Sequence, residues 1–122
     1  MDIAVLHEEL NFIHSEWNEL GNYFDKTEEK ILDNLRNDKK EWAKKHFENL
    51  KEIENKMRPL RNNIINVYEN LAQFSFEKGK LYEESKFKEK AEEFYKNRYN
   101  RNERSLKLIG ILNRNGIDVN NN

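Results

Sequence analysis

Apolar residues recur every three or four positions along the first 24 residues, and polar residues fill most positions between them. The members of this seam are Ile3, Leu6, Leu10, Ile13, Trp17, Leu20 and Phe24. Alternating steps of three and four residues place side chains on one face of a helix, as in the heptads of a coiled coil. The pattern predicts a helix from about Asp2 to Leu20.

Two features after Leu20 bear on where this first helix ends. Gly21-Asn22 offers a place to stop, and Asp25 followed three residues later by Glu28 resembles a capping box at which a new helix begins. A single helix that runs straight through this stretch is the alternative.

A second, longer seam begins after Thr27 and contains a proline. Its members are Leu32, Leu35, Lys39, Trp42, His46, Leu50, Ile53, Met57, Leu60, Ile64, Val67, Leu71 and Phe74. The spacing keeps its phase through Pro59, although proline inside a helix removes a hydrogen bond and clashes with the preceding turn. We therefore expect a kink or a break close to residue 58, and favour a break with Pro59 in the first turn of a new helix.

The last helix is expected from about Leu81 to Asn113, after Gly79 ends the preceding one. The chain is therefore predicted to be all-α, with about four helices at 2–20, 27–57, 60–78 and 81–113. Because a 30-residue helix is about 45 Å long, we expect an elongated antiparallel helical bundle or a coiled-coil hairpin. Residues 1–114 would form a single helical domain, and the polar residues 115–122 a flexible tail.

The composition supports helices and limits the size of the core. One proline and one threonine among 122 residues do not fit an all-β domain, which needs turns and β-branched residues. Only 36% of the residues are apolar, and a short chain with long seams often gains stability from a second copy. We expect self-association as a homodimer.

The residues predicted to form an interface seam are Ile3, Leu6, Leu10, Ile13, Trp17 and Trp42. The pattern does not decide between packing of the seams within one chain and packing between chains. Each tryptophan is accordingly either a core residue or an anchor that a partner buries.

Charge is distributed unevenly along the chain, although the net charge is −1. Residues 1–33 have a net charge of −7 and residues 94–114 a net charge of +5. The basic residues of the second segment are Lys96, Arg98, Arg101, Arg104, Lys107 and Arg114. They form an ordinary solvated face, pair with the acidic first helix within the chain or across a dimer, or bind nucleic-acid phosphates.

No motif for catalysis or metal binding appears in the sequence. His7, His14 and His46 lack the Glu-x-x-His and HExxH spacings, there is no cysteine, and the glycines are isolated. We expect no enzyme activity, metal, cofactor or small-molecule substrate. No apolar run approaches the roughly 20 residues of a membrane span, so we expect no membrane partner.

These observations favour a non-catalytic helical protein–protein interaction module in the cytoplasm, such as an adaptor, an assembly subunit or a small inhibitor of a larger complex. The alternative is a nucleic-acid-binding accessory protein that uses the basic residues of the C-terminal helix.

Overall fold

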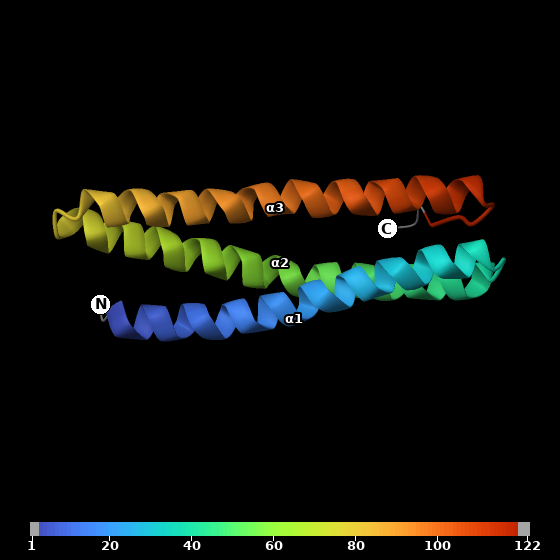
Figure 1. Cartoon of the computed structure of the whole chain (residues 1–122), viewed down its shortest axis with the longest axis horizontal. Helices are drawn as coiled ribbons and strands as arrows, with labels where there is room; N and C mark the ends of the chain where they lie inside the picture. The colour runs from blue at the N-terminus through green and yellow to red at the C-terminus, as the bar shows by residue number, and fades with distance from the viewer. Residues whose placement is uncertain (1–2, 120–122) are drawn as a thin grey trace.

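The computed structural model shows three long helices that run up, down and up beside one another (Figure 1). Residues 3–119 are described, except for the side chains of residues 97–102. Helix α1 spans Ile3–Arg36, α2 spans Lys40–Glu77 and α3 spans Leu81–Arg114. With 38 residues, α2 alone is about 57 Å long. The predicted all-α, elongated antiparallel bundle is confirmed.

Each of these helices ends in a Schellman motif, in which a residue in the left-handed conformation follows the last turn. That residue is Asp38 after α1, Gly79 after α2 and Gly116 after α3, with φ angles of 56°, 71° and 80°. The next amide donates to a carbonyl five residues back: Lys39 to Asn34, Lys80 to Ser75 and Ile117 to Leu112, at 2.7, 2.8 and 2.9 Å. This geometry lets the chain reverse within the three-residue connections 37–39 and 78–80.

The predicted helix boundaries at Gly21-Asn22 and at Pro59 are wrong. Gly21 is buried inside α1, so the single continuous helix considered as the alternative is the one observed. The helical cost of one glycine is about 1 kcal/mol, which the burial of Phe24 and Ile31 in the next turns offsets. The real boundary lies at residues 37–39, where neither glycine nor proline marks it.

Pro59 lies inside α2 and ends no helix. Figure 1 shows that α2 changes direction near its middle. Pro59 is also close to the middle of the helix, which runs from Lys40 to Glu77. A bend of this kind is the usual response to a proline ring placed against the preceding turn. The helix continues because the residues on both sides of Pro59, including Met57 and Ile64, are buried in the same core.

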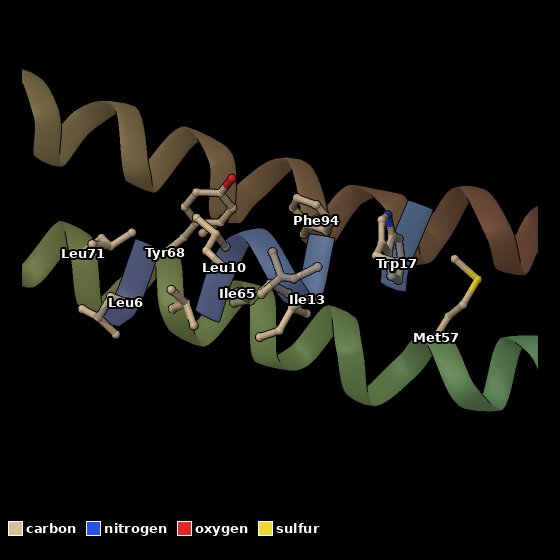
Figure 2. Packing of buried hydrophobic residues seen from close by; sticks show 12 residues of the cluster. Leu6, Leu10, Ile13, Trp17, Met57, Ile65, Tyr68, Leu71 and Phe94 are labelled. Atoms are coloured by element: carbon tan, nitrogen blue, oxygen red, sulfur yellow. The ribbon is translucent and has the colours of Figure 1, made fainter. Parts of the chain in front are cut away.

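The core consists of two clusters that follow each other along the bundle. The first joins the N-terminal half of α1 to the C-terminal half of α2 and the N-terminal half of α3; Figure 2 shows Leu6, Leu10, Ile13, Trp17, Met57, Ile65, Tyr68, Leu71 and Phe94 of this cluster. The second contains Phe24, Ile31, Ala43, Phe47, Leu50, Leu108, Leu112, Ile117 and Val119. Helix α2 takes part in both clusters and lies against both other helices.

The segment after α3 differs from the flexible polar tail expected for residues 115–122. Ile117 and Val119 are both buried in the second cluster. The Schellman motif at Gly116 directs the chain back toward the bundle, so that Ile117 covers Leu112. Residues 120–122 lie outside the described residues.

Candidate functional site

The predicted interface seam lies mostly inside the chain's own core. Leu6, Leu10, Ile13 and Trp17 are buried against α2 and α3 (Figure 2). Ile3 packs partly buried against the same cluster. Trp17 makes an edge contact with Phe94, with ring centroids 5.5 Å apart. These side chains are therefore absent from the surface that a partner would meet.

Trp42 differs from the rest of the predicted seam because 55% of its surface is exposed. The Lys45 ammonium lies 5.0 Å from the centre of its ring, and the His46 ring lies 6.3 Å away. The helix places Trp42 one residue before the buried Ala43, at the margin of the core-facing side. Its exposed ring remains available for contact with another molecule.

Among the members of the predicted basic set whose side chains are described, Arg104 is the one that forms ion pairs with α1. Its Nη2 lies 2.8 Å from Asp25 and 2.7 Å from Glu28, and its Nε donates to the second Glu28 oxygen at 3.1 Å. The guanidinium also stacks 4.6 Å above the centre of the Phe24 ring. The hydrogen bond with Glu28 is the main cause that raises the pKa of Arg104. This arrangement fits the pairing of the basic segment with the acidic helix.

The other members of the basic set are placed differently. Lys96, Lys107 and Arg114 are exposed, and their positions fall on one side of α3 at 100° per residue. Arg98 and Arg101 lie outside the described side chains. The structure therefore leaves three basic side chains of this set open to solvent and holds Arg104 against α1.

The histidines take part in aromatic contacts. His14 Nε2 and the Tyr68 hydroxyl are hydrogen-bonded at 2.9 Å, and the His14 ring lies 5.2 Å from the Phe94 ring. Burial, with a smaller contribution from the charge of Lys90, lowers the pKa of His14. His7 lies 6.2 Å from the ring of Phe87. Among the described residues, no group of three or more His, Asp or Glu side chains could hold a metal ion.

A groove lies between α2 and α3, and we call it the acidic groove. It has a volume of about 1020 Å³ and is lined by Glu69, Ala72, Gln73, Phe76, Glu84, Ser85, Lys88, Glu89, Ala91, Glu92 and Tyr95. Phe76 and Tyr95 are 54% and 52% exposed, whereas Ala72 and Ala91 are buried. The groove thus combines a floor of small residues with exposed aromatic side chains.

Carboxylates dominate the electrostatics of the acidic groove, with four glutamates to one lysine in its lining. The Lys88 ammonium lies 3.4 Å from Glu84, so its charge is already matched. The Tyr95 hydroxyl donates to Glu69 at 3.1 Å. This hydrogen bond and the charge of Glu69 raise the pKa of Tyr95. A positively charged ligand is therefore favoured here.

The acidic groove was not identified from the sequence. Its two walls come from segments about 69–76 and 84–95, which meet only because α2 and α3 are antiparallel neighbours. The available signal was Phe76, an aromatic residue two positions beyond the last member of the second seam. In an otherwise polar stretch, such a residue indicates an exposed apolar position.

No described helix contains an apolar stretch of the kind that spans a lipid bilayer. The chain matches no protein-family model, and no curated protein or solved structure shows significant similarity to it.

Proposed function

We propose that this chain is a non-catalytic helical protein–protein interaction module that acts as an adaptor, an assembly subunit or a small inhibitor of a larger complex. The acidic groove would be its docking surface. The observation that carries the proposal is the exposure of Phe76 and Tyr95 beside this groove, in a bundle whose two core clusters are already closed without them.

Exposed aromatic side chains at a groove are the usual anchors of protein interfaces. Fully burying a phenylalanine contributes about 1.5–3 kcal/mol, and a few such residues commonly dominate the binding energy. Leu81 and Tyr82 are also exposed, in the first turn of α3.

The alternative function, nucleic-acid binding through the C-terminal helix, has weaker support. Exposed Lys107 and Arg114 favour it, but Arg104 is held by Asp25 and Glu28. Titration with DNA and RNA at two salt concentrations tests it, because phosphate contacts give a steep loss of affinity with salt. Salt-dependent binding that Lys107→Glu with Arg114→Glu abolishes would favour this alternative over the interaction module.

Photo-crosslinking in the cells that make the protein tests the proposed function. A photoreactive phenylalanine analogue replaces Phe76 in one variant and Phe12 in a control, since Phe12 is an exposed apolar residue of α1 outside the groove. We expect a discrete protein adduct from position 76 and none of that mass from position 12. Identical adducts from both positions, or no protein adduct, would contradict the proposal.

Self-association is a separate part of the proposal, because the seam residues buried in the core leave other surfaces to form a dimer. Light scattering of the purified chain distinguishes a monomer of 14.9 kDa from a species of twice that mass. If the chain were a monomer at all concentrations, the predicted homodimer would be wrong. The proposed docking surface would not be affected by that result. The cytoplasmic location stays a prediction from the sequence.

A further inference from the structure

The shape of the acidic groove fits an α-helix. Its lining extends along α3 from Glu84 to Tyr95, which corresponds to about 16 Å or three helical turns. The floor contains the buried side chains of Ala72 and Ala91, and small residues allow the backbone of another helix to approach closely. The groove is open at the surface, so a helix about 10 Å wide could lie along it as a further member of the bundle.

The aromatic residues mark the two ends of this groove. Phe76 lies next to the turn that joins α2 to α3, whereas Tyr95 lies at the far end, where its hydroxyl reaches Glu69. A helix lying in the groove would contact both rings with apolar side chains on one of its faces, at positions i, i+3 or i+4, and i+7. The occupant is therefore expected to be amphipathic.

The charge around the groove determines the polar face of the occupant. Glu89 and Glu92 are exposed on α3, and Glu69 is exposed on α2 opposite Tyr95. The single lysine of the lining, Lys88, is already beside Glu84, and Glu89 lies 3.9 Å from Lys86 outside the lining. Glu69 and Glu92 therefore add negative charge to the rim beyond these two pairs. Lysine or arginine residues flanking an apolar stripe would complement this rim, and like charges would be repelled.

We infer that the acidic groove binds a basic amphipathic helix of a partner protein; this inference rests on the proposed function and names its partner class. A second copy of the chain is a poor occupant. A two-fold interface through the same face places each glutamate of the rim near its own counterparts, which is unfavourable. Nucleic acids and anionic membranes would meet the same repulsion.

Three synthetic peptides of about 14 residues test the inference by fluorescence anisotropy with the intact protein. The first carries one leucine face flanked by lysines, the second has the same leucines with glutamates, and the third has the composition of the first with the leucines dispersed. We expect the first peptide to bind about tenfold or more tightly than the other two, with affinity that falls as salt rises. Equal binding of all three peptides would overturn the inference.

Two variants of the protein locate the binding. Glu89→Lys with Glu92→Lys should weaken binding of the basic peptide by about tenfold or more, whereas the control Glu8→Lys with Glu9→Lys makes the same charge change on exposed positions of α1. Ser85→Trp fills the groove without changing the charge and should also reduce binding. Circular dichroism verifies that each variant is folded.

Binding that survives both groove variants, or that the α1 control reduces equally, would show non-specific attraction to an acidic protein and refute the inference. This outcome is distinguishable from failure of the proposed function. A protein adduct at position 76 without binding of the basic peptide would retain the interaction module and discard this class of partner.

Discussion

The Tyr68 hydroxyl and His14 Nε2 lie 2.9 Å apart, and this hydrogen bond joins α2 to α1 inside a cluster of aromatic rings. Phe94 of α3 contacts both rings, with centroid distances of 5.2 Å to His14 and 6.2 Å to Tyr68. One polar pair is therefore surrounded by side chains of all three helices. Such a pair fixes the register of the helices, because a shift would leave partly buried polar atoms without partners.

This pair makes stability depend on pH. Burial and the nearby Lys90 lower the pKa of His14, so the folded protein binds fewer protons than the unfolded chain near and below the ordinary histidine pKa of about 6.5. The free energy of unfolding should be greatest above pH 6.5 and decrease as the pH falls below it. Urea unfolding at several pH values measures this slope.

His14→Gln keeps a hydrogen-bonding side chain beside Tyr68 but cannot titrate, so it serves as the control for this prediction. The difference in stability between the original protein and the variant should change between pH 7 and pH 5. A difference that stays constant over this range would show that His14 does not link folding to pH.

Arg104 should contribute more to stability than an ordinary surface arginine. Arg104→Ala removes the contacts with Asp25 and Glu28 as well as the stacking on Phe24. We expect a loss of about 1–2 kcal/mol, because Arg104 is still 36% exposed and solvent weakens its ion pairs. The matched control is Arg36→Ala, which removes an exposed pair with Asp33 within α1 and should cost less than about 0.5 kcal/mol. Equal losses in thermal unfolding would contradict this prediction.

Replacing Gly79, which follows α2, or Gly110, which lies within α3, by alanine should change the free energy of unfolding in opposite directions. Gly79 has a φ of 71°, so Gly79→Ala should cost about 1 kcal/mol although no atom lies within 4 Å of the added methyl group. Gly110 lies within α3, where the methyl group would meet only the Arg114 Nη1 at 3.8 Å. Gly110→Ala should therefore raise the free energy of unfolding by about 0.5–1 kcal/mol. If both substitutions shifted the denaturant midpoint in the same direction, the assigned end of α2 would be refuted.

Pro59 should be destabilising for α2 itself. Pro59→Ala restores an amide that can donate within the helix and removes the clash with the preceding turn, so we expect thermal stability to rise by the equivalent of about 1–3 kcal/mol. The ring is exposed, and its loss creates no cavity in the core. A lower melting temperature would show that the bend is needed to keep both core clusters packed.

Much of the candidate site could not be predicted from the sequence because it depends on which helices are neighbours. The basic segment was identified, but only the folded chain shows that Arg104 pairs with Asp25 and Glu28, 79 and 76 residues away. The acidic groove has the same origin, since Glu69 and Tyr95 come together through the antiparallel pairing of α2 and α3. The partners in both contacts are far apart in the sequence, so no local pattern indicates that they meet.

The sequence by itself determined the helical class and the side of α1 that enters the core, since apolar side chains spaced by three and four residues can be buried together only on a helix. In α2 the seam was correct from Leu50 onward, whereas Trp42 near its start is exposed. The sequence also marked the end of α2, because Gly79 readily adopts a positive φ. Tertiary structure decided the rest. Burial of Phe24, Ile31, Met57 and Ile64 carried the helices through Gly21 and Pro59, and Asp38 took a left-handed conformation that its residue type only permits. Local preferences of about 1–3 kcal/mol are outweighed when several large side chains on both sides of the weak point are buried in a shared core.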